Sequence, residues 1–132
     1  MNNKKLGNDF ENKFSEILFK NGFWVHLLNQ NASGQPADVI AAKNHKAYLI
    51  DCKVCSGNSF KLDRVESNQN MAMDLWKSCG NGEGWFAVEI NERIFMIPHF
   101  SIKTLTHEKS VMNESEIYEY GIMLDEWMVK ND

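Results

Sequence analysis

Two apolar runs separated by a short polar stretch constrain the fold of this chain most strongly. Residues 39–42 and 47–50 are apolar, and the tetrapeptide between them reads Lys-Asn-His-Lys. Runs of this length around a short polar turn are typical of a β-hairpin. If the loop consists of Asn44 and His45 alone, Lys43 pairs with Lys46, and the register of the whole hairpin is fixed.

This register predicts that two acidic residues face each other across the hairpin. Asp38 lies opposite Asp51, and the Cβ atoms of such a pair are about 4.5–5.5 Å apart, where two like charges are destabilising. Lys53 is two residues beyond Asp51 and therefore projects from the same face of its strand. Two carboxylates and an ammonium group on one face predict a divalent metal site next to a reacting group.

The same residues resemble the signature of a known nuclease superfamily. The pattern is Pro36-Ala37-Asp38, twelve residues, then Asp51-Cys52-Lys53, which is similar to the PD-(D/E)XK motif with one residue between the proline and the aspartate. The resemblance implies an α/β fold with a central mixed β-sheet flanked by helices, built on the αβββαβ core of restriction endonucleases.

Within that superfamily the chain looks most like the Holliday-junction resolvases of the RecU-like and archaeal kinds. The residues that carry this likeness are Gly7-Asn8-Asp9-Phe10-Glu11 in the first predicted helix, Ser33-Gly34 before the aspartate, and Gln69 on the helix after the motif. The implied function is a metal-dependent endonuclease that acts on branched DNA, with possible assembly as a homodimer. Two alternatives are a sequence-specific restriction-type endonuclease and a non-catalytic nucleic-acid- or protein-binding module.

The resemblance also implies roles for individual residues. Asp38, Asp51 and the backbone carbonyl of Cys52 would hold Mg²⁺ or Mn²⁺, because these ions prefer oxygen ligands. Lys53 would orient the attacking water or stabilise developing negative charge. Five polar or basic residues are candidate contacts to the DNA: Ser33, Lys43, Lys46, Lys61 and Arg64.

Two further candidates for the site have a local alternative each. Glu11 corresponds in position to the first-helix glutamate of the superfamily, which implies that it would bind a second metal ion or a metal-bound water. Asn8-x-x-Glu11 also resembles a capping box. Gln69 interrupts the apolar stripe of its helix, and a buried amide needs a partner, so we expect it to point at the carboxylates. An ordinary, partly exposed glutamine is the alternative.

Composition favours one domain in a chain of 132 residues, with 43% hydrophobic and 24% charged residues. The net charge of −4 does not by itself favour a nucleic-acid partner, but residues 1–66 carry nine basic and seven acidic residues, against five and eleven in residues 67–132. Three cysteines argue against a disulfide framework. No apolar run resembles a membrane span or a signal peptide, so we expect a cytoplasmic protein without a membrane partner.

Periodicity and turn residues predict the remaining elements. We expect helices over residues 3–21, about 62–79, 99–106 and 122–129, and strands over 23–28, 85–90, 93–97 and 117–120, with loops at 29–35 and 107–115. The nuclease core would span about residues 5–100, and residues 101–132 would form a C-terminal appendage. The apolar residues of that appendage are the candidate dimer surface, and packing onto the sheet is the alternative.

Overall fold

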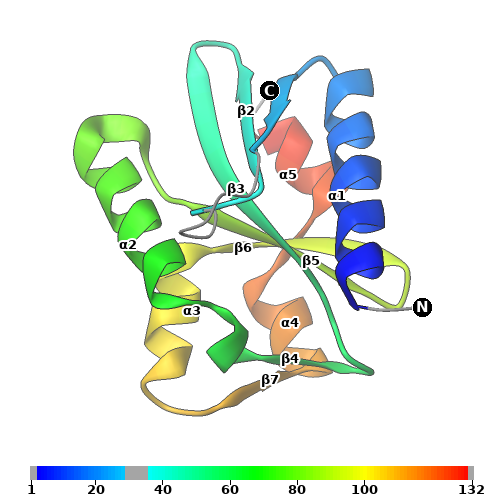
Figure 1. Ribbon diagram of the computed structural model, residues 1–132, viewed down its shortest axis with the longest axis vertical. Helices are drawn as coiled ribbons and strands as arrows, with labels where there is room; N and C mark the ends of the chain where they lie inside the picture. The colour runs from blue at the N-terminus through cyan, green and yellow to red at the C-terminus, as the bar shows by residue number, and fades with distance from the viewer. Residues whose placement is uncertain (1–2, 29–35, 131–132) are drawn as a thin grey trace.

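A six-stranded mixed sheet runs through the middle of the structure, a computed structural model that describes residues 3–28 and 36–130 (Figure 1). The strand order is β1-β2-β3-β5-β6-β8, in which β3 and β5 are parallel and the other neighbours are antiparallel. Its strands are β1 (Trp24–Leu27), β2 (Val39–Lys43), β3 (Lys46–Val54), β5 (Trp85–Ile90), β6 (Arg93–Pro98) and β8 (Ile122–Met123).

The hairpin predicted from the sequence is confirmed residue by residue. Lys43 pairs with Lys46, and the register continues to Val39 and Ile50. The two loop residues, Asn44 and His45, both have positive φ, at 52° and 67°. Positive φ at both central positions is the geometry of a two-residue type I′ turn, whose twist matches that of the flanking strands. The β5–β6 hairpin closes in the same way through Asn91 and Glu92, with φ of 51° and 63°.

Helices cover both faces of the sheet (Figure 1). One face packs against α1 (Asn3–Lys20) and α5 (Leu124–Lys130), through an apolar cluster that includes Phe14, Ile50 and Trp127. The other face packs against α2 (Ser67–Trp76), α3 (His99–Thr106) and α4 (Glu114–Tyr120), through a second cluster that includes Phe86 and Met73. The α/β fold with a central mixed sheet is therefore confirmed.

The predicted helix over residues 62–79 is wrong at its beginning. Phe60 belongs to a short strand, β4 (Ser59–Lys61), a 3₁₀ turn follows at η1 (Leu62–Arg64), and α2 begins only at Ser67. A second sheet, made by β4 and β7 (Val111–Asn113), brings the fully buried Phe60 opposite Met112. The helix continues into a π-helical turn, η2 (Lys77–Asn81), where Gly80 has a φ of 95°.

The C-terminal quarter also differs from the prediction. Residues 107–115 are not entirely loop, since they contain β7, and residues 117–120 form part of helix α4 rather than a strand. Asn113 caps α4 by accepting a hydrogen bond from the backbone N–H of Glu116, whose side chain bonds back to the N–H of Asn113. The sequence carried this capping-box signal. Ile117, Trp127 and Met128 are buried, whereas Tyr118, Tyr120 and Met123 are exposed. Packing onto the sheet therefore accounts for part of the apolar segment.

Candidate active site

Asp38 and Asp51 meet where the β2–β3 ladder ends. The last ladder pair is Val39 and Ile50, whereas β3 continues to Val54. The backbone N–H of Asp38 donates to Ile50 O at 3.1 Å, and the Asp38 side chain accepts from the Cys52 N–H at 2.7 Å. The Asp38 carboxylate thus binds a backbone N–H of β3 just past the last pair of the ladder. This hydrogen bond holds the carboxylate next to the Asp51 carboxyl group.

Asp51 is buried to an unusual degree for an acid, with 1% of its surface exposed. Burial raises its pKa well above the usual range, the negative charge of Asp38 raises it further, and the Lys53 ammonium opposes both effects. One carboxylate oxygen, Oδ1, accepts from Gln69 Nε2 at 3.1 Å. The other, Oδ2, is 3.0 Å from Lys53 Nζ but has no well-formed hydrogen bond among the described residues.

Gln69 connects the acidic pair to the lysine, and its predicted direction toward the carboxylates is confirmed. Its Oε1 accepts from Lys53 Nζ at 3.3 Å and from the backbone N–H of Glu66 at 3.2 Å. Glu66 is the N-cap of α2, and Gln69 completes a capping box there. Since this box fixes which end of the amide faces the helix, Nε2 must face Asp51. We did not predict this second use of Gln69, although Glu66-x-x-Gln69 follows the spacing of the motif.

Glu11 reaches the same site from α1. Its pKa is raised from 4.5 to about 7, first by burial and then by the charge of Asp38, while Lys53 lowers it. The thiol of Cys52 is influenced by Glu11 as well as by both aspartates, and its pKa is raised well above the usual range, chiefly by desolvation. The alternative role of Glu11 in a capping box with Asn8 is wrong, because α1 begins at Asn3 and Asn8 lies within the helix.

Two of the predicted DNA contacts line one pocket. Lys61 and Arg64 line a pocket of ≈ 370 Å³ that also includes Cys52 and Val54 of β3 and Gly7 of α1. Arg64 donates to Val54 O at 2.6 Å, which anchors its guanidinium at the end of β3. Cys52 and Val54 project from the face of β3 opposite Asp51 and Lys53. The pocket, with its two cationic side chains, therefore lies on the α1 side of the sheet.

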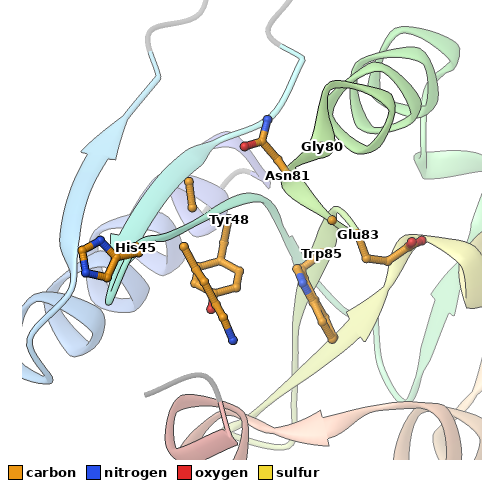
Figure 2. Close-up of a pocket in the computed structure, with 9 residues that line it drawn as sticks. His45, Tyr48, Gly80, Asn81, Glu83 and Trp85 are labelled. Atoms are coloured by element: carbon orange, nitrogen blue, oxygen red, sulfur yellow. The ribbon is translucent and has the colours of Figure 1, made fainter.

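The other predicted DNA contacts are elsewhere. Lys43 donates to Asn21 O at 2.9 Å and lies over the Phe23 ring. Its ammonium group therefore binds the backbone directly after the end of α1. Lys46 lines a separate pocket of ≈ 400 Å³ with Tyr48, Trp85 and the turn at residues 80–83 (Figure 2). Lys46 is five residues before Asp51 on β3, or about 16 Å along the strand. Ser33 is outside the described residues.

The donor groups of the site fit a hard divalent cation. Asp38 and Asp51 supply carboxylate oxygens, which such ions prefer, and the buried Oδ2 of Asp51 lacks a well-formed hydrogen bond among the described residues. Within residues 3–28 and 36–130, no three His, Cys, Asp or Glu side chains are close enough together to form a complete metal centre. The structure therefore provides a pair of oxygen donors, with Glu11 nearby as a third acid.

A mixed sheet with helices on both faces and a buried Asp–Asp–Lys cluster at the end of a hairpin defines a restriction-endonuclease-like nuclease fold. The family model for the archaeal Holliday junction resolvase (Hjc) matches residues 2–131, and the chain belongs to this family. The family predicted from the sequence, that of the archaeal Holliday junction resolvases, is therefore confirmed.

Two individual proteins illustrate these similarities. The 1.6 Å structure of Hjc from Archaeoglobus fulgidus, described as a Holliday junction resolvase from an archaeal hyperthermophile, superimposes with a TM-score of 0.71. The match covers 92% of this chain and 99% of that one at 17% identity, and shows the shared fold. UPF0102 protein FN1370 of Fusobacterium nucleatum is 32% identical over 78 residues, which span 58% of this chain and 65% of that protein.

No helix in the described part of the chain combines the length and the apolar character that crossing a membrane requires.

Proposed function

We propose that this chain cleaves phosphodiester bonds at the branch point of four-way DNA junctions. The observation that carries the proposal is the buried Asp38–Asp51 pair, with Lys53 and Gln69 fixed beside it. Like charges in such a position are costly, and a fold retains them where a cation and a phosphate are to be bound. Family membership supports the same substrate class.

Each side chain has a distinct part in this proposal. Asp38 and Asp51, with the Cys52 carbonyl, would hold Mg²⁺ or Mn²⁺, and the bound ion would polarise the scissile phosphate and activate water. Lys53, with 12% of its side chain exposed, presents its ammonium group to that phosphate while Asp51 and Gln69 hold it in place. Preorganised charge of this kind stabilises the transition state without further rearrangement. Glu11 completes the acidic set from α1.

The pocket lined by Lys61 and Arg64 supports a path for the DNA backbone. Lys61 and Arg64 would contact phosphates of the DNA backbone, and such contacts position the substrate without reading its sequence. Lys43 and Lys46, at the far end of the hairpin, would contact a more distant arm of the junction, and Ser33 stays a predicted contact. The cytoplasmic location expected from the sequence also stays a prediction.

Symmetric cleavage of a junction needs two active sites, and we propose a homodimer to provide them. The predicted C-terminal surface is a smaller candidate, because Ile117 and Trp127 are core residues and Tyr118, Tyr120 and Met123 are exposed by less than half. A better one is the outer side of α2 and α3, where Met71, Leu75 and Phe100 are all exposed. Sedimentation of the wild type and of a Met71→Glu variant tests this interface, and a wild type that stays monomeric with junction DNA would exclude it.

A cleavage assay tests the proposed activity directly. Four-way junction, flap, linear duplex, single-stranded DNA and RNA are compared with Mg²⁺ and with EDTA, for the wild type and for Asp51→Asn and Lys53→Ala. We expect Mg²⁺-dependent cleavage of the junction by the wild type, and binding without cleavage by both variants. Cleavage of linear duplex at one defined sequence would indicate the restriction-type alternative, and binding without cleavage by the wild type would indicate a non-catalytic module.

A further inference from the structure

The outer edge of the central sheet carries an exposed aromatic pair with no part in the site described above. Trp24 and His26 lie on β1, and Trp24 is 62% exposed. Their rings stack with centroids 6.0 Å apart and an interplanar angle of 14°. Single exposed apolar side chains are common on proteins, but two parallel rings on an edge strand present a flat aromatic surface to a ligand.

This pair is on the same face of the sheet as the acidic site. His26 pairs with Ile40 of β2, and Ile40 pairs with Leu49 of β3. Leu49 precedes Asp51 by two residues, so both project from one face, and alternate residues on β1 place Trp24 on that face with His26.

The spacing between the pair and the acidic site matches a short stretch of nucleic acid. Neighbouring strands are about 4.8 Å apart and rise about 3.3 Å per residue, which places the Cα atoms of His26 and Trp24 about 8 Å and about 14 Å from that of Asp38. Bases in a strand of stacked DNA rise about 3.4 Å each. The Cα atoms of the pair are therefore about two to four nucleotide steps from that of Asp38.

We propose that Trp24 and His26 form a stacking platform for the exposed faces of nucleobases at the branch point of the substrate DNA. The inference rests on the proposed function and adds a means of recognition to it. Bases inside a duplex stack on their neighbours, whereas a branch point can offer a free base face to an aromatic side chain. Such stacking strengthens binding by about 5- to 150-fold per base, so the platform favours branched DNA over linear duplex.

The test measures affinity for a four-way junction and for a linear duplex of the same sequence, in an Asp51→Asn background in which the DNA stays intact. The variants are Trp24→Ala with His26→Ala, Trp24→Phe, and Phe19→Ala as a control at an exposed aromatic on α1. We expect the double alanine variant to lose about ten-fold or more in junction affinity and less than about two-fold in duplex affinity. Trp24→Phe, which keeps a ring, and Phe19→Ala should remain near the parent.

Tryptophan fluorescence gives a second readout, since Trp24 is one of four tryptophans. Junction DNA should quench the emission of the parent, and Trp24→Phe should lose most of that quenching. Equal losses of affinity on junction and duplex would overturn the proposal. So would a change in oligomeric state of Trp24→Ala without DNA, which would assign the pair to a protein interface. If the wild type cuts junctions and the double alanine variant binds them with normal affinity, the stacking platform is refuted and the proposed function stands. If the wild type neither binds nor cuts junctions, the proposed function is refuted as well.

Discussion

Replacing Glu11 by glutamine tests the electrostatics of the acidic site in the metal-free protein. Burial and the charge of Asp38 raise the pKa of Glu11 from 4.5 to about 7, against the opposing effect of Lys53. A carboxyl group whose pKa is higher in the folded than in the unfolded state binds its proton more tightly in the fold. The free energy of unfolding must therefore fall as the pH rises from 4.5 to about 7, and remain low above that range.

The size of this effect follows from the two pKa values. The interval from 4.5 to about 7 corresponds to about 3.4 kcal/mol, at about 1.36 kcal/mol for each pH unit. Glu11 is only partly buried, and because solvent screens its interactions, we expect about 1–2 kcal/mol. With a urea m-value of about 2 kcal/mol/M, this is a change of about 0.5–1 M in the unfolding midpoint.

Urea unfolding in EDTA, at about pH 5 and about pH 7.5, measures this difference for the wild type and for Glu11→Gln. The wild type should lose more stability than Glu11→Gln between the two conditions, by the amount given above. The raised pKa of Asp51 contributes to both proteins and therefore cancels. Glu16→Gln is the matched control, because Glu16 is on the same helix and its pKa is lowered by Lys20. An identical pH dependence in the wild type and Glu11→Gln would refute the placement of this carboxyl group beside Asp38.

Three further predictions concern the rest of the site. Asp51→Asn should raise the free energy of unfolding without metal by about 1 kcal/mol or more, because the raised pKa shows that the fold prefers the neutral group, and a lower midpoint would contradict this. Gln69→Ala should lower the free energy of unfolding by about 2–3 kcal/mol, because the Asp51 carboxyl group loses its donor and α2 loses its capping box. Thermal denaturation measures this loss, and a much smaller loss would contradict the prediction. Lys61→Ala and Arg64→Ala should each weaken binding to all DNA structures, and each should reduce the slope of log K against log salt concentration by about 1. Lys103→Ala, on α3, is the control and should leave the affinity and the slope unchanged.

The sequence alone determined the hairpin that carries the acidic pair. Two apolar runs around Asn44 and His45 fix the register through local turn geometry, and this register brings Asp38 and Asp51 together. Helix α1, the β5–β6 hairpin and α3 were equally readable, because their periodicity and end signals lie within a few residues of each other. The family likeness followed from the spacing of the same site residues.

Only the tertiary structure decided which distant segments meet. Phe60 is a strand residue because Met112, more than fifty positions away, pairs with it and covers it. Lys43 and Arg64 look equivalent in the sequence, but one closes the end of α1 and the other is anchored at the end of β3. Long-range pairing and burial set these outcomes, and neither is encoded in the local pattern that fixes a turn or a helix cap.

The position of Glu11 shows the same division. Its place on an amphipathic helix could be read from the sequence, but its proximity to Asp38 depends on how α1 packs across β2 and β3. That packing buries Phe14 and Leu18 and carries the glutamate to the point where the hairpin ladder ends. The hairpin could therefore be predicted with its two aspartates. The approach of the third acid and the pocket lined by Lys61 and Arg64 depend on how the helices and the sheet pack together.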